Sequence, residues 1–237
     1  MYKKNSDRSF DKSYIPKPLL ISLPVFLLAT SNIAFAQPAT ALSVNVVVNS
    51  NQDGKIQADD RLTLREAIAI VNGNLPLEQL SAAEKALVSS RSNQSRIEFN
   101  LPPGQTKIIL ESILPPLKTS GTVIDGTTQP GYDESKSATA EIEIPIPVVE
   151  ITSVADKEIF RGLTVTADNV TIQGLSIYGF SSQHRDTATL PPADVIIAPY
   201  DAVLGMDKGL RRRRDKENFS EQFPKNTTIQ NNWLGIT

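Results

Sequence analysis

Short apolar runs separated by turn-forming residues dominate the chain after residue 95. The runs lie at 97–99, 107–110, 123–124, 148–151, 163–165 and 170–177. Each is too short to form a stable hairpin sheet alone, and no Asn-Gly or Gly-Asn turn joins successive runs. The pattern therefore predicts an all-β chain whose strands pair with partners distant in the sequence.

Several of these runs resemble one another. G-L-T-V at 162–165 resembles G-L-S-I at 174–177, and N-x-T-I-Q at 169–173 recurs at 226–230. Because one coil of a solenoid cannot bury its inward side chains alone, such repetition favours stacked coils. It predicts a right-handed parallel β-helix, with Ile172 and Ile229 in neighbouring rows and Thr171 and Thr228 facing outward. A β-sandwich with similar strands is the alternative.

Residues 61–90 have a different pattern, which predicts two short helices. Thr63 and Glu66 fit a capping box, and a second one, at 81–84, begins a helix expected to reach about Val88. Gly73 suits the position after the first helix, where the backbone adopts positive φ. Four apolar residues fall on one face of the first helix, namely Leu64, Ala67, Ile68 and Val71. This face is expected to cover the first coil as a short α-helical N-terminal cap.

The first 36 residues are typical of a secretory signal peptide. A basic leader precedes an apolar core at 18–30, and Ala34-Phe35-Ala36 forms a small-x-small cleavage site. A transmembrane anchor is the alternative, but the core is short for a bilayer and contains Pro24. We therefore expect cleavage before Gln37, secretion to the extracellular space or outer cell surface, and no transmembrane span afterwards.

The amino-acid composition limits the kinds of functional site and partner that the chain can have. The chain has no cysteine, which excludes disulfides and thiolate sites, and its one histidine, His184, lies between Gln183 and Arg185 in a polar stretch. The chain holds 24 basic and 26 acidic residues, of which the leader holds five and two, so residues 37–237 carry a net charge of −5. This balance argues against a nucleic acid as partner.

The chain divides into a loop and helical cap at 37–95 and β-helix coils at 96–237. A charged insertion at 181–225 interrupts the coils and contains four consecutive arginines at 211–214. Such a run could bind an acidic polysaccharide or lipid headgroup, or could simply be a solvated loop with acidic flanks.

The loop at 49–60 is a candidate calcium site. Its oxygen-bearing side chains fall at loop positions 1, 3 and 5, with glycine at position 6 and aspartate at position 12, a spacing that suits a hard cation. The candidate ligands are Asn49, Asn51, Asp53, Lys55 (through its carbonyl) and Asp60, with Ile56 expected to anchor the loop. The loop looks like a dockerin calcium repeat, although only one copy is present. A plain turn leading into the first helix is the alternative.

No residue is assigned a catalytic role. Glycoside cleavage would need paired carboxylates, and lyase chemistry would need a basic side chain beside a metal-binding carboxylate cluster. The acidic residues near the runs, namely Asp125, Glu150, Asp156 and Asp168, are expected to cap turns by accepting hydrogen bonds from backbone N–H groups.

The stretch from Asn49 to Asn72 resembles the CSLREA module that precedes many bacterial surface β-helices. That module has an Asp-Gly loop, a C-S-L-R-E-A-I run and a nearby asparagine; here the corresponding residues are Asp53-Gly54, L-T-L-R-E-A-I at 62–68, and Asn72. The similarity extends over about residues 44–180. Leu62 replaces the cysteine, so no disulfide of that family can form.

The resemblance implies a secreted or surface β-helix of the pectate-lyase-like type but does not fix an activity. We expect a non-catalytic adhesive, structural or carbohydrate-binding role. The alternatives are a polysaccharide lyase or glycoside hydrolase with its active site in downstream coils, and a dockerin-like module. The apolar segment at 227–236 has no closing cap after it, which predicts a front fragment of a longer protein.

Overall fold

The computed structural model describes residues 43–137, 144–182, 191–207 and 223–235. Three features predicted from the sequence lie outside these ranges: the signal peptide, His184 and the arginines at 211–214. Within them the chain is mostly sheet with few helices, in agreement with the all-β prediction. No helix of the described segments is long and apolar enough to cross a membrane.

The strands of the described segments form three sheets. Sheet A has the order β11-β8-β5-β3-β1-β2, sheet B the order β12-β9-β6-β4, and sheet C pairs β10 with β7. The strands of sheet A are β1 (Ser43–Val48), β2 (Val88–Arg91), β3 (Arg96–Phe99), β5 (Val123–Asp125), β8 (Thr171–Gln173) and β11 (Thr228–Gln230). Those of sheets B and C are β4 (Lys107–Leu110), β6 (Val149–Ser153), β9 (Leu175–Tyr178), β12 (Trp233–Leu234), β7 (Arg161–Val165) and β10 (Ala193–Ile197).

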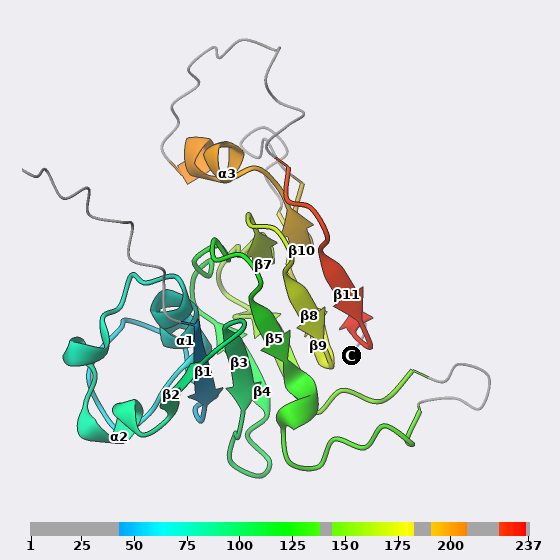
Figure 1. Cartoon of the computed structure of the whole chain (residues 1–237). Helices are drawn as coiled ribbons and strands as arrows, with labels where there is room; N and C mark the ends of the chain where they lie inside the picture. The colour runs from blue at the N-terminus through cyan, green and yellow to red at the C-terminus, as the bar shows by residue number, and fades with distance from the viewer. Residues whose placement is uncertain (1–42, 138–143, 183–190, 208–222, 236–237) are drawn as a thin grey trace, which may run out of the picture. The chain divides into compact units, whose positions relative to one another are not determined.

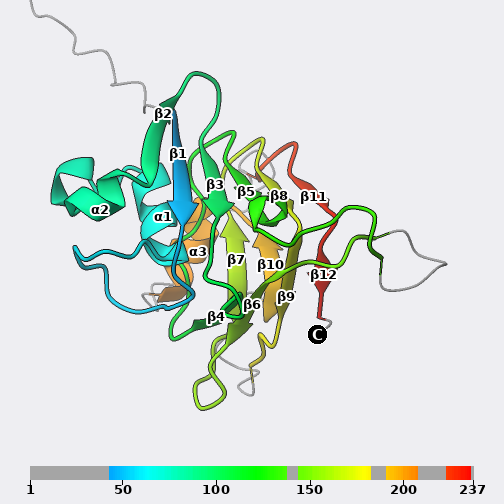
Figure 2. The same cartoon turned by 90° about the horizontal axis from the view of Figure 1, so that it is seen from below.

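Strand pairing is parallel in all three sheets except between β1 and β2. From β5 to β12, consecutive strands lie in sheets A, B, C, A, B, C, A and B. Figures 1 and 2 show the result: β1, β3, β5, β8 and β11 lie side by side in sequence order. Neighbours within a sheet are therefore separated by long stretches of sequence, as the missing hairpin turns predict.

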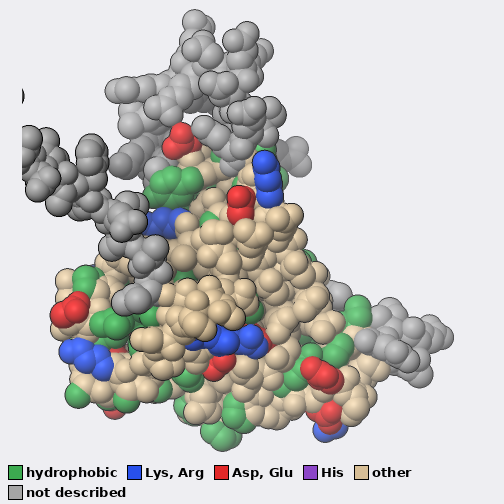
Figure 3. Space-filling view, in the orientation of Figure 1, with side chains coloured by type: hydrophobic (Ala, Val, Ile, Leu, Met, Phe, Trp, Pro, Cys, Tyr) green, Lys and Arg blue, Asp and Glu red, His purple; other side chains and the backbone are tan. Residues whose placement is uncertain are grey.

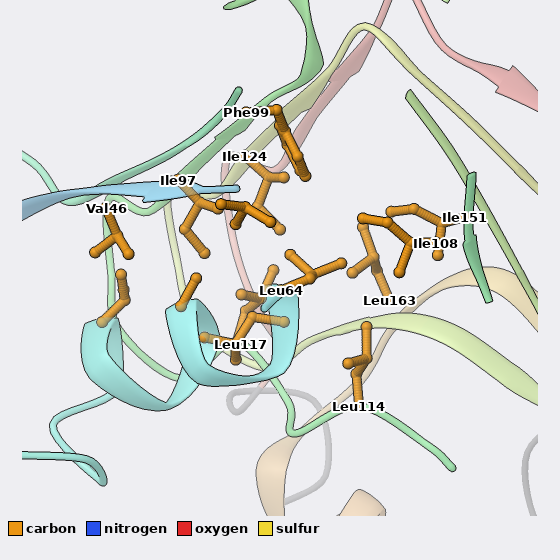
Figure 4. Close-up of a cluster of buried hydrophobic side chains, with 14 of the residues drawn as sticks. Val46, Leu64, Ile97, Phe99, Ile108, Leu114, Leu117, Ile124, Ile151 and Leu163 are labelled. Carbon is orange, nitrogen blue, oxygen red and sulfur yellow. The ribbon is translucent and has the colours of Figure 1, made fainter. Parts of the chain in front are cut away.

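The strand register places side chains of the same type next to one another on neighbouring strands. In sheet A, Ile97 pairs with Ile124, Ile124 with Ile172, and Ile172 with Ile229, and the first three are fully buried. Ile229, at the last strand, is 39% exposed. The predicted pairing of Ile172 with Ile229 is thus confirmed, and Figure 4 shows how buried side chains from several strands and α1 meet in one core.

Turns beside sheet A repeat as the strands do. Gly121, Asn169 and Asn226 all have positive φ and each stands two residues before a strand of this sheet. Asn231 also has positive φ, a conformation that asparagine tolerates in turns. At Gly126 the backbones approach so closely that a Cβ atom would lie 2.1 Å from the carbonyl oxygen of Gly174. Side chains larger than hydrogen are excluded there.

The helix α1 (Leu64–Val71) begins at the predicted capping box, in which Thr63 accepts from Glu66 N and the Glu66 side chain returns to Thr63 N. Its predicted apolar face is buried, and the helix packs against β1 and β3. Asn72 ends the helix, and Gly73 follows with φ of +70°. Both helix-end predictions are confirmed.

The second predicted helix is shorter than expected. It comprises α2 (Ala82–Lys85), which begins at the predicted capping box of Ser81 and Glu84 and is preceded by the 3-10 helix η1 (Leu77–Gln79). Instead of continuing to Val88, the chain enters β2, which pairs antiparallel with β1 at the edge of sheet A. For the four residues Val88–Arg91, backbone pairing with the open edge of β1 outweighs their weak helical preference.

The charged insertion at 181–225 also contains unpredicted structure. It includes β10, which pairs in parallel with β7, and helix α3 (Tyr200–Asp207). The sequence predicts only a polar, charged insertion over 181–225, with no strand at 193–197. Pairing with β7 supplies the backbone partners that the sequence pattern could not reveal.

Candidate functional site

The loop that carries the predicted calcium ligands is held by a buried ion pair. Asp53 accepts from Arg65 Nε and from an Arg65 terminal nitrogen, both at 2.7 Å, and its side chain is 1% exposed. The same carboxylate accepts from the backbone N–H of Glu111 at 2.8 Å. Arg65 in turn donates to the carbonyl oxygens of Ser112 and Ile113. The pair thereby ties the loop, α1 and the segment after β4 to one another.

Glu66 fixes the other side of the loop. It is buried, and its carboxylate accepts from Thr63 N and Thr63 Oγ1 and also from the backbone N–H of Gln57. Between this carboxylate and Asp53 lies a polar hollow of about 100 Å³, whose lining also includes Lys55 and Asp59.

The other proposed calcium ligands are spread over the loop. Asn49 accepts from Leu62 N, Asn51 donates to the carbonyl of Lys107, and Asp60 lies beside Arg61 with 84% of its side chain exposed. Of the five proposed residues, Asp53 and Lys55 line the hollow. The segments that the structure describes hold no group of three or more His, Cys, Asp or Glu side chains arranged for a metal ion. A calcium ion that used Asp53 would have to compete with the Arg65 guanidinium, and calcium binding stays a prediction.

Other motif residues also have structural partners. Asn72 donates to the Pro116 carbonyl and accepts from Lys118 N, so it joins the end of α1 to the segment before β5. The expectation that Ile56 anchors the loop is wrong, because this side chain is 46% exposed. Its place is taken by Leu62, which is fully buried where the resembled family has cysteine.

Two of the acidic residues considered for catalysis serve turns, as predicted. Asp125 is fully buried, accepts from Thr127 N and Thr127 Oγ1, and forms an ion pair with Arg96. Asp168 accepts from the backbone N–H of Lys225 at 2.7 Å. Asp125 thus links β5 to β3 and to its own turn, and Asp168 links the turn before β8 to the segment before β11.

Glu150 does not lie at a turn, and the prediction for it is wrong. It is on β6, where Tyr178 Oη donates to its Oε2 at 2.5 Å and Lys107 Nζ lies 3.1 Å from the same oxygen. Lys107 Nζ also lies 5.6 Å from the centroid of the Tyr178 ring. The three residues, here called the Lys-Glu-Tyr cluster, come from three successive strands of sheet B.

Mutual interactions shift the ionisation of the cluster. Burial alone raises the pKa of the Glu150 carboxyl, but the hydrogen bond from Tyr178 and the hydrogen bond and charge of Lys107 outweigh it, so the pKa lies below its ordinary value. Hydrogen bonding with Tyr178 and then Glu150, together with the Glu150 charge, raises the pKa of Lys107. Burial first, and then the hydrogen bond to Glu150, raises the pKa of the Tyr178 hydroxyl. The carboxylate and ammonium are therefore both charged at neutral pH.

The cluster could not be found from sequence spacing, because its members are far apart in the chain. The strand register is what brings the members together. Lys107 pairs with Glu150, Glu150 with Ser176, and Ser176 with Trp233. Tyr178 stands two residues after Ser176, on the same face of β9. A correct alignment of the coils would have placed these residues in adjacent outward rows.

Charge on the molecular surface is mixed. Figure 3 shows basic and acidic side chains scattered over the visible face and in places side by side. On β3 of sheet A, for example, the partly exposed side chains of Arg96 and Glu98 form an ion pair. Comparison of the chain with protein-family models, with curated proteins and with solved structures gives no match.

Proposed function

We propose that this chain is a right-handed parallel β-helix protein, secreted or held at the cell surface, with a non-catalytic adhesive, structural or carbohydrate-binding role. The observation that carries the proposal is that, from β5 to β12, every third strand returns to the same sheet, in parallel and in register. Parallel strands joined by a crossover in one sheet are right-handed in about 98% of cases, which supports the handedness.

The side chains support a binding or structural role over catalysis. Asp53, Arg65, Glu66 and Asn72, which belong to the motif that resembles the CSLREA module, all make hydrogen bonds that hold α1 to the strands or to the preceding loop. Asp125 is likewise engaged in an ion pair and a turn. A carboxylate committed to such partners is poorly placed to transfer a proton to a substrate.

Export and surface exposure test the first half of the proposal. The full chain, expressed in a Gram-negative host, should lose its leader before Gln37 and become accessible to protease on intact cells or appear in the medium. Terminal sequencing and cell fractionation measure both. Uncleaved protein confined to the cytosol would contradict the proposal.

Product analysis tests the second half against the alternative, a polysaccharide lyase or glycoside hydrolase. The purified chain is incubated with acidic and neutral polysaccharides, and new reducing ends and unsaturated ends are measured. We expect neither to form. Sustained release of reducing or unsaturated ends would instead show that the chain is a polysaccharide-cleaving enzyme.

A calcium ion in the loop is a second proposal, which rests on the spacing of the oxygen ligands over residues 49–60. Two of the proposed ligands, Asp53 and Lys55, line the polar hollow. Calorimetry with calcium, on wild type and on Asp60→Asn, tests it. Asp60 is largely exposed, so its substitution leaves the fold intact while removing one proposed ligand. Weak binding that falls further in Asp60→Asn is expected, and no heat at millimolar calcium would show that the loop is only structural.

A further inference from the structure

The outer face of sheet B combines aromatic, charged and hydroxyl side chains. Ile108, Ile151 and Ile177 are buried on β4, β6 and β9. Because side chains alternate along a strand, the residues on either side of each isoleucine point outward. The outward residues are Lys107, Ile109, Glu150, Thr152, Ser176, Tyr178 and Trp233. Half of the Lys107 side chain and about a third of the Glu150 side chain are exposed, while Ser176 is buried between its neighbours in the row.

Tyr178 lies across the strands. Its backbone belongs to β9, yet its hydroxyl reaches Glu150 on β6 and its ring lies within 5.6 Å of the Lys107 ammonium on β4. The hydrogen bond to Glu150 limits rotation of the ring, so its orientation is fixed before any ligand arrives. Trp233, half-buried on β12, adds a second aromatic side chain on the same face.

The charges on this face are balanced. Lys107 and Glu150 form an ion pair at 3.1 Å, and the other outward residues are uncharged. An uncompensated lysine would favour an anionic ligand, but here the carboxylate beside it repels anions. A carboxylate and an ammonium held side by side instead offer an acceptor and donors to hydroxyl groups.

We propose that this face binds a neutral polysaccharide chain that runs across the strands, with a sugar ring stacked on Tyr178 and sugar hydroxyls bonded to Lys107 and Glu150. The inference rests on the proposed function and gives it a ligand class and a site. Adjacent strands lie about 4.8 Å apart, comparable to the length of one sugar unit, so four strands span roughly 14 Å, or about three sugars. Because the proposed contacts come from several neighbouring strands, the face suits an extended chain better than a small molecule.

Binding measurements on the exported full chain test the proposal. Calorimetry is done with hexasaccharides of β-1,4-linked glucose, mannose and xylose, and with an oligogalacturonate of equal length as the acidic probe. The variants are Tyr178→Ala, Trp233→Ala and Lys107→Met. Gln173→Ala is the matched control, because Gln173 faces outward on sheet A, where it accepts a hydrogen bond from Gln230. Thermal unfolding of each variant shows whether it is folded.

We expect at least one neutral hexasaccharide to bind more tightly than the acidic one, and Tyr178→Ala to weaken it about tenfold. Lys107→Met, at a half-exposed position, should also weaken binding while remaining folded, so the test holds even if Tyr178→Ala unfolds. Gln173→Ala should bind like the wild type.

Three results would overturn the inference. Binding that none of the sheet B variants changes would place the ligand elsewhere and leave the proposed function standing. Tighter binding of the acidic probe would refute the ligand class. No binding to any probe would remove the site, while export and surface exposure would still decide the proposed function independently.

Discussion

Asp53 and Arg65 show how one buried ion pair can organise a loop. Both oxygens of the carboxylate and all three guanidinium nitrogens have partners within 3 Å, and the residues involved come from three separate segments. Burying a charge is costly unless all its hydrogen-bonding groups are satisfied, and here they largely are. Removing one partner would leave an uncompensated charge in a protected site.

Arg65→Met is therefore expected to lower the free energy of unfolding by about 3 to 5 kcal/mol. The control is Arg61→Met, which removes a guanidinium whose side chain is 46% exposed beside Asp59 and Asp60, and this change should cost less than about 1 kcal/mol. Denaturant unfolding of both variants gives the comparison. Equal losses would mean that the Asp53–Arg65 pair does not organise the loop.

Glu150 should titrate at an unusually low pH. Because Tyr178 and Lys107 favour its ionised form, its folded pKa lies below the unfolded one. The group therefore contributes stability above its unfolded pKa, and this contribution is lost as the pH falls through the folded pKa. Tyr178→Phe removes one hydrogen bond, so the pKa of Glu150 should rise.

Carbon-detected NMR titration of the Glu150 carboxyl in both proteins measures this shift. Glu98, paired with Arg96 on sheet A, is the internal reference, since Tyr178→Phe leaves its surroundings unchanged. An unchanged Glu150 titration would show that Tyr178 does not hold the carboxylate in solution.

At the scale of elements, α1 is the piece whose placement the sequence predicts best. The capping box and the following glycine are local signals, set by residues within one or two turns of the helix ends. The apolar face is also local, and it packs on β1 and β3. Figure 4 shows Leu64 of this helix directed into the same cluster as Val46 and Ile97.

Ile68→Asp should destabilise the protein by more than about 3 kcal/mol, because it buries a carboxylate without a partner. Ile68 is fully buried. Leu77→Asp makes a comparable chemical change in the nearby η1, where the side chain is 39% exposed, and should cost far less. Thermal unfolding of the two variants decides, and similar melting temperatures would place α1 away from the core.

Elements that depend on distant partners were harder to predict. The segment 170–177 reads as one strand, but Gly174 has positive φ and divides it into β8 and β9, which belong to different sheets. β2 and β10 were missed because their stability comes from pairing with β1 and β7, far away in the sequence. The Lys-Glu-Tyr cluster was missed for the same reason, since it exists only once the register is known.

At the scale of the whole molecule, the last strand of each sheet differs from the strand before it. Val165, Ile172 and Ile177 are fully buried, one in each sheet. Their register partners, namely Ile197, Ile229 and Leu234, are 39%, 39% and 41% exposed. The contribution of an inward-facing side chain to the free energy of unfolding therefore depends on whether its strand is the last of the sheet or lies before it.

A pair of identical substitutions measures this dependence. Ile172→Asp should cost more than about 3 kcal/mol of unfolding free energy, whereas Ile229→Asp, at the equivalent position one strand later, should cost less than about 1 kcal/mol. Denaturant unfolding gives both values. An equally large loss at Ile229 would mean that its side chain is covered in solution.

Sheet A has one more consequence, which concerns how such a chain can change. Its equivalent positions Arg96, Val123, Thr171 and Thr228 follow one another after 27, 48 and 57 residues, yet their pairing stays in register. The register is thus set by the strands and the residues beside them. The connections between successive strands can differ in length without changing this register. Segments of new sequence could accordingly be added or deleted in these connections, in evolution or by a protein engineer, without redesign of the stacked interior.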